Sequence, residues 1–123
     1  MNKLGFIDEQ LGVISVPYAF MEWTKKDKSL YFTGEIIEEP VTVESGLEES
    51  TMILNGFARG DFLSLETEKE KIKAHFHPIH GLHGQTDSGA IVVFFDGAFY
   101  VPTGEADFKR IQINLKIKEW KVK

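Results

Sequence analysis

The sequence has no cysteine among its 123 residues. This absence excludes disulfide bonds, thiolate metal ligands and cysteine nucleophiles, and it suits a reducing compartment. Long hydrophobic runs are also missing, since the longest, Ala90 to Phe95, is far shorter than the roughly 18 apolar residues of a membrane helix. The first residues, MNKLGFIDEQLG, carry acids where a signal peptide needs apolar side chains. We therefore expect a cytoplasmic protein that does not bind membranes.

Sequence motifs for nucleotide binding and for hydrolytic catalysis are missing too. There is no G-x-S-x-G, GxxxxGK[ST] or G-x-G-x-x-G pattern, and no HEXXH zinc signature. Glutamates are numerous, but none forms a distinctive pair of the kind that acid–base catalysis needs. We expect no catalytic residue, no cofactor and no enzymatic activity.

Charge is unevenly distributed along the chain, whose net value of −5 argues against binding nucleic acid by neutralising phosphates. Six glutamates and no Lys or Arg lie between Ser29 and Ala58, whereas six basic residues and one acid follow from Lys109 onward. These segments are either two solvated faces or an acidic face of one copy that meets a basic face of the next. The residues predicted for such an interface are Glu35, Glu38, Glu48, Glu49, Arg59, Lys116, Lys118 and Trp120.

Helical periodicity appears in two segments of what we expect to be one domain spanning residues 1–123. Residues Asn2 to Leu11 predict a short N-terminal helix that ends at Gly12. The main helix spans about residues 61–76, with Asp61 as its N-cap. Phe62, Leu65, Ile72 and Phe76 should face a sheet, and three Glu–Lys pairs spaced i,i+3 should line the exposed side.

The remaining apolar segments predict a mixed, mostly antiparallel sheet of about five strands, so the fold class is α+β. We expect strands at Tyr18–Trp23, Leu30–Glu38, Thr51–Arg59 and Gly89–Phe95, with Val41–Val43 as a continuation of the second. Asp96-Gly97 predicts a tight turn across which Ala98–Val101 pairs back. Glu44–Ser50 is expected to be an exposed, mobile loop, and His77–Ser88 a second loop.

The last strand has the clearest alternation in the chain. Ile111, Ile113, Leu115 and Ile117 alternate with polar residues, which predicts one buried and one exposed face. Trp120 and Val122 break this phase. A bulge near Glu119 would explain the break. Alternatively, the strand runs past its own sheet and Trp120 packs on a partner.

All four histidines lie close together, at His75, His77, His80 and His83. Such a cluster can bind zinc, nickel or copper, so a metal- or small-ligand-binding domain is the alternative function. The competing interpretation is a surface loop in which His75 lies near the C-terminal end of a helix, where a positive charge is favourable.

Two segments resemble a known family. They are TGEIIEEPVTVESGLEESTMILNGFARGDFLSLETEKEKIKAHF and VPTGEADFKRIQINLKIKEWKV. Together, from Tyr31 to Val122, they resemble small tail terminator and head–tail joining proteins of long-tailed phages and Gram-positive prophages. The shared features are a strand carrying Gly-Glu, an acidic loop, a strand leading into a charged helix, and an amphipathic C-terminal strand.

The resemblance implies a non-enzymatic structural protein with a mixed sheet flanked by helices. It implies a homo-oligomeric ring, usually of six copies, that caps the tail tube and joins it to the head connector. The partners would be tail tube and connector proteins, and the protein would move from the host cytoplasm into the virion. The loop from Phe76 to Gln85 is not a feature of that family.

Overall fold

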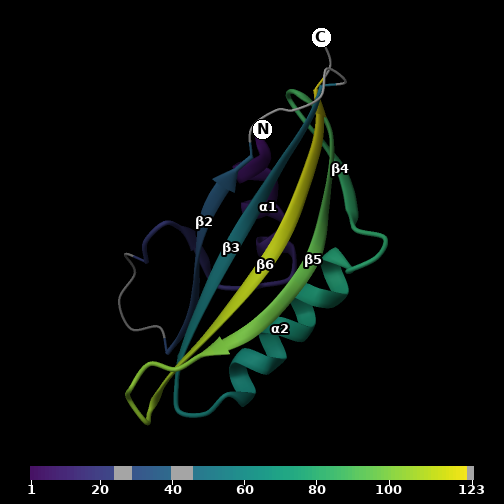
Figure 1. The fold of residues 1–123 in the computed structure, drawn as a ribbon. Coiled ribbons are helices and arrows are strands. Elements are labelled where there is room, and N and C mark those ends of the chain that lie inside the picture. Colours follow the sequence, from purple (N-terminus) through teal and green to yellow (C-terminus); the bar gives the residue numbers. More distant parts are fainter. Residues whose placement is uncertain (24–28, 40–45, 122–123) are drawn as a thin grey trace.

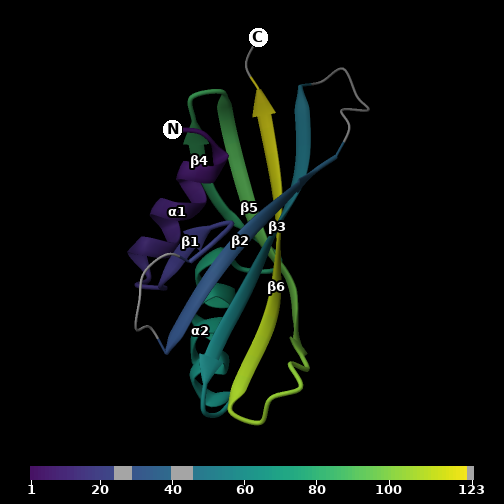
Figure 2. The same cartoon turned by 90° about the vertical axis from the view of Figure 1, so that its left-hand side faces the viewer.

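The computed structural model describes residues 1–23, 29–39 and 46–121. Within these ranges the chain forms one six-stranded sheet of order β1-β2-β3-β6-β5-β4, and both helices lie on the same face of it (Figures 1 and 2). The strands are β1 (Tyr18–Phe20), β2 (Leu30–Glu38), β3 (Leu47–Arg59), β4 (Leu82–Thr86), β5 (Gly89–Val101) and β6 (Phe108–Lys121), and the helices are α1 (Lys3–Val13) and α2 (Leu63–Phe76). Neighbouring strands are antiparallel except β1 and β2. The α+β class is confirmed, with six strands in place of about five.

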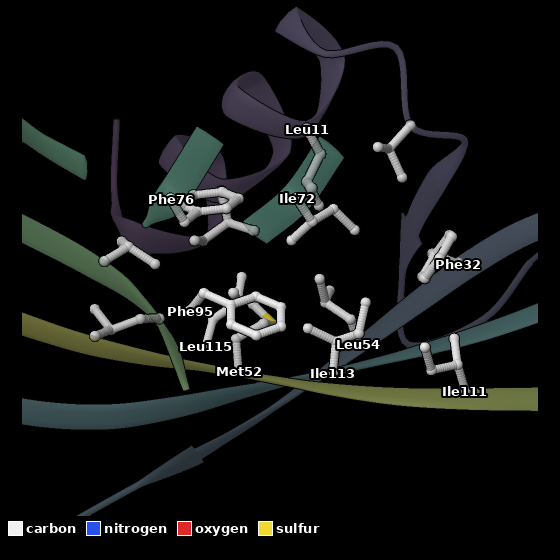
Figure 3. Close-up of a cluster of buried hydrophobic side chains, with 14 of the residues drawn as sticks. Leu11, Phe32, Met52, Leu54, Ile72, Phe76, Phe95, Ile111, Ile113 and Leu115 are labelled. Atoms are coloured by element: carbon white, nitrogen blue, oxygen red, sulfur yellow. The ribbon is translucent and has the colours of Figure 1, made fainter. Parts of the chain in front are cut away.

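The core lies between the sheet and the two helices (Figure 3). All four alternating apolar residues of β6 are fully buried, as the sequence predicts. They meet Met52 and Leu54 of β3 on one side and Leu11, Ile72 and Phe76 of the helices on the other. Burying each such side chain contributes about 1.5–3 kcal/mol, so β6 forms the centre of the core.

Helix α1 is close to its prediction. The Asn2 side chain accepts a hydrogen bond from the Gly5 amide at 2.9 Å and so caps the first turn. Phe6, Ile7 and Leu11 are buried. The helix passes Gly12 and ends at Val13.

Helix α2 starts later than predicted, and its surroundings differ in two ways. Asp61 accepts a hydrogen bond from the Leu63 amide at 3.1 Å, which fixes the turn before the helix. Phe62 lies outside the helix and is 42% exposed, so it is not part of the core, although its ring meets that of Tyr100 in β5 with centroids 4.8 Å apart. Of the predicted Glu–Lys pairs, Glu66–Lys69 and Glu68–Lys71 form at 2.6 Å, but Glu68 is buried rather than on the exposed side.

Two segments predicted to be loops contain strands instead. Leu47–Ser50 belongs to β3 because it pairs with the end of β6, Leu47 opposite Trp120 and Ser50 opposite Ile117. Leu82–Thr86 forms the edge strand β4, paired with β5. The predicted continuation at 41–43 and the first residues of the predicted acidic loop, 44–45, lie outside the described residues.

The Asp96-Gly97 turn prediction is wrong. Strand β5 continues through this dipeptide, with Phe95 opposite Leu115 and Ala98 opposite Ile113 of the same partner strand. Three steps along β5 therefore match two along β6, which is a bulge with one extra residue. Gly97 supplies the positive φ, 115°, that the irregularity needs.

The bulge predicted near Glu119 is also misplaced, because β6 keeps its register with β3 and β5 through Trp120. The alternation of inward and outward side chains continues past Ile117, but the next inward residue, Glu119, is polar. Glu119 is only 4% exposed, and its carboxylate accepts a hydrogen bond from the Thr86 hydroxyl at 2.5 Å. Trp120 is 41% exposed and lies on the opposite face. The strand predicted at Tyr18–Trp23 is shorter in the structure. It ends at Phe20, and the next residue, Met21, adopts a positive φ of 69°.

Candidate interaction surfaces

The sheet face opposite the helices is covered by no described element, and we call it the outer face (Figure 2). At one end, three aromatic rings from neighbouring strands stack across it. Tyr31 lies 5.2 Å from Phe57, and Phe57 lies 5.7 Å from Phe108, measured between ring centroids. Because each ring covers its neighbour's face, the row stabilises the sheet and offers little stacking surface for nucleic-acid bases.

A polar bridge lies beside this aromatic row. Asn55, in the middle of β3, donates from its side-chain amide to Glu35 of β2 at 3.1 Å. It also accepts a hydrogen bond from Arg110 of β6 at 2.7 Å. The guanidinium carbon of Arg110 in turn lies 5.7 Å from the centroid of the Phe57 ring. Glu35, one of the predicted interface residues, is therefore held by its own sheet.

The acidic and basic segments of the sequence meet within one chain. Antiparallel pairing of β3 with β6 brings Glu49 within 3.9 Å of Lys116 and 3.7 Å of Lys118. Glu39, which follows β2 on the other side of β3, lies 2.8 Å from Lys116. The hydrogen bond to Glu39 raises the pKa of Lys116. These pairs are partly exposed, so each contributes at most about 1 kcal/mol. Complementary faces on separate copies are not needed to explain this charge pattern.

The same pairing occurs on the helix side of the sheet. Lys121 lies 3.0 Å from Glu48, and Lys3 of α1 lies 2.7 Å from Glu38. The hydrogen bond from Lys3 lowers the pKa of Glu38, and the one to Glu48 raises the pKa of Lys121. Two more of the predicted interface residues are thus used within the chain, because Glu38 links β2 to α1 and Glu48 links β3 to β6.

The two remaining predicted interface residues lie on the outer face, far apart along the sheet. Arg59 lies 3.5 Å from Asp107, with its guanidinium carbon 5.4 Å from the Phe108 ring centroid. Trp120 lies beside the opposite end of β3. The sequence prediction therefore brought together residues from both faces of the sheet, with Glu38 and Glu48 on the helix side and the others on the outer face.

The histidines do not converge on one point. His75 lies 2.8 Å from the Gln10 side-chain oxygen and so links α2 to α1, and its burial lowers its pKa. His77 Nδ1 accepts hydrogen bonds from the backbone amides of Ile79 and His80, both at 3.1 Å. His83 Nε2 lies 3.0 Å from the His80 carbonyl oxygen. Across the described residues, no three His, Asp or Glu side chains are grouped so that they could hold a metal ion.

One surface was missed at the sequence level. Phe62, Leu63, Glu66 and Tyr100 line an open cavity of about 450 Å³ at the start of α2. The Tyr100 hydroxyl donates to the Glu66 carboxylate. Partial burial, and then this bond, raise the pKa of Tyr100 to about 12. Only the bulge brings Tyr100 to this side of β5, so the sequence pattern alone gave no signal of it.

Comparisons with known proteins identify a fold but no family. No family model matches the chain, and no curated protein matches it. A solved structure whose name carries no functional information has the same fold, with a TM-score of 0.69 and 16% identity over 94% of this chain and 88% of that one. At this identity the likeness shows the fold alone. In the part of the chain that the structure describes, no helix is long and apolar enough to cross a membrane.

Proposed function

We propose that the chain is a non-enzymatic assembly protein of a phage or prophage tail. A ring of copies, six in the family that the sequence resembles, caps the tail tube and joins it to the head connector. The protein assembles in the cytoplasm of the bacterial host and stays in the virion. The resemblance of Tyr31 to Val122 to tail terminator and head–tail joining proteins motivates this role.

The observation that carries the proposal is the uncovered outer face. It exposes large apolar side chains towards both of its ends: Ile37 at 55%, Trp120 at 41% and Phe99 at 52%. They give a neighbouring protein apolar contact points on this face, although single exposed apolar side chains are also common on protein surfaces. A structural protein between tube and connector needs such surfaces on more than one side.

Three of the ionisable groups with shifted pKa values owe those shifts to surface ion pairs, which suits a structural role. The pKa of Glu66 is lowered first by its hydrogen bond to Lys69 and then by that from Tyr100. Lys116 and Lys121 likewise owe their shifts mainly to a paired glutamate. Ion pairs on the surface account for these shifts without a catalytic cleft.

The first test is the mass of tag-free protein in solution, by size-exclusion chromatography with light scattering, across concentration and salt and with or without chelator. We expect an oligomer that chelator does not dissociate. Electron microscopy should show rings, and these should sediment with tubes assembled from the tail tube protein of the same phage or prophage.

A matched pair of variants identifies the binding face. Trp120→Ser, on the outer face, should weaken tube binding, whereas Val13→Ser, which is 65% exposed at the end of α1, should not. A protein that stays monomeric at high concentration and does not bind tubes would contradict the proposal. An oligomer that falls apart on chelation would instead favour a metal-dependent role for the histidines.

A further inference from the structure

The two ends of the region around α2 differ in their charged residues and histidines. Residues 60–70 contain four acids and one lysine, whereas residues 71–86 contain two lysines, all four histidines and no acid. Because α2 has 14 residues, these ends are separated by about 20 Å at 1.5 Å per residue. Part of this charge is paired within α2, because Lys69 meets Glu66 and Glu70, and Lys71 meets Glu68. The difference that remains between the two ends favours head-to-tail contact between identical copies.

The acidic end carries the cavity at the start of α2, which we call the socket. Leu63 is 70% exposed at its edge, and Phe62 and Tyr100 form its wall with ring centroids 4.8 Å apart. Glu66 is held as a carboxylate on the rim by Lys69 and Tyr100. Lys109 lies against Phe62 as well, 4.9 Å from its ring centroid. The socket therefore suits an apolar side chain with a basic or hydrogen-bond-donating group beside it.

The basic end carries a protruding apolar side chain, Ile79, which we call the knob. It is 75% exposed, more than any other large apolar residue in the described part of the chain. The connection that bears it projects from the side of the molecule between α2 and β4 (Figure 1). His77 fixes the turn, because its Nδ1 accepts hydrogen bonds from the backbone amides of Ile79 and His80. The imidazole rings of His77 and His80 also stack, with their centroids 4.7 Å apart. The knob is thus held in place before any partner arrives.

We propose that the knob of one copy enters the socket of a second copy. Ile79 would fill the apolar cavity, and the neighbouring His80 would lie beside the Glu66 rim. The contact uses two different surfaces, so a pair of copies keeps one unused knob, on one copy, and one unused socket, on the other. Such a heterologous contact closes into a ring or grows as an open array. The inference rests on the proposed function only for the choice of a second copy as the occupant.

Ile79 would act as the anchor of a wider interface. A stable interface buries about 800 Å² on each partner, and a few residues in pockets supply most of its energy. Ile79→Ser and Leu63→Ser should each raise the dissociation constant of self-association roughly tenfold or more. Both side chains are exposed, so neither change removes core packing.

Mixing the two variants gives the decisive test. Ile79→Ser keeps its socket and Leu63→Ser keeps its knob, so each alone should be monomeric by light scattering. An equimolar mixture should form dimers and stop there, because the dimer has no intact knob or socket left. Val13→Ser should assemble like the unmodified protein, and Ile79→Leu should retain assembly because it keeps the apolar volume.

Three results would overturn the inference: an unmodified protein that is monomeric at every concentration, an assembly that both variants leave intact, or a mixture that forms no dimer although circular dichroism shows both variants folded. Sedimentation of each variant with tail tubes separates this inference from the proposed function. If the unmodified protein binds tubes without self-associating, the inference fails and the proposed function stands. If the unmodified protein does not bind tubes, the proposed function fails.

Discussion

Single residues decide how closely the strands and helices approach. Gly56, in the middle of β3, lies under the Phe32 ring. A Cβ at this position would come within 2.4 Å of Phe32 Cε2 and 2.8 Å of Ile111 Cγ2. The glycine therefore makes room for a phenylalanine that is fully buried. From the sequence alone, the segment around Gly56 predicts only a strand that leads into a helix.

Gly56→Ala should destabilise the protein by about 1–3 kcal/mol, because the added methyl group overpacks the core. Urea unfolding followed by circular dichroism measures the change. Gly12→Ala is the control, since nothing lies within 4 Å of its Cβ in α1. There the substitution should stabilise by about 0.5–1 kcal/mol. Equal effects of the two substitutions would contradict this account of Gly56.

His75 makes stability depend on pH. Its folded-state pKa lies below its ordinary value because burial disfavours the charged form. The unfolded chain therefore binds a proton first, so stability is full above about pH 6.5 and falls as the pH drops below it, until the folded-state pKa is passed. His75→Gln should reduce the stability difference between pH 7.5 and pH 5.5 in urea titrations. Val13→Ser, which changes an exposed side chain and no titrating group, should leave that difference unchanged.

At the scale of elements, tertiary pairing overrides local turn signals. Asp-Gly between apolar segments predicts a hairpin, yet the 14-residue strand β6 offers partners on both sides of the dipeptide, and β5 stays paired along it. Strand β4 was not predicted from the sequence for a related reason. It contains Gly84, whose Cβ would lie 2.4 Å from Phe6 Cε1 of α1, and such a glycine resembles a loop residue.

Gly97→Ala tests whether the bulge depends on its backbone conformation. Nothing lies within 4 Å of a Cβ at this position, so no steric clash arises with other side chains. The φ of 115° is nevertheless strained for an alanine, at a cost of about 1–3 kcal/mol. Thermal unfolding should show a lower midpoint. Asp96→Ala, at the exposed neighbouring position, should have little effect, and a similar loss from both substitutions would argue against backbone strain as the cause.

The elements with long regular patterns were the ones that the sequence predicted well. The alternation from Ile111 to Ile117 and the helical spacing of Leu65, Ile72 and Phe76 each extend over several repeats, so packing and pattern agree. The candidate interface was predicted less well, because it depends on which strands become neighbours. Charges separated by more than 60 positions, such as Glu39 and Lys116, meet at 2.8 Å.

At the scale of the whole molecule, this internal pairing changes what to expect of assembly. The acidic segment and the basic segment largely neutralise each other along β3 and β6. Salt should therefore affect contacts between copies less than the uneven sequence suggests, because screening acts most on charges that face solvent. Apolar groups at the ends of the outer face and around α2 are left as the main candidates for holding copies together.

The position of β6 in the sheet also bears on how the chain is made. It is the last strand in sequence, yet it lies between β3 and β5 and supplies the buried isoleucines. During synthesis, β2–β3 and β4–β5 can each form a hairpin, but the two hairpins cannot join until residues 108–121 have left the ribosome. Until then both halves present an unpaired strand edge and an incomplete core, which favour aggregation. The nascent chain thus has no stable native sheet until β6 emerges.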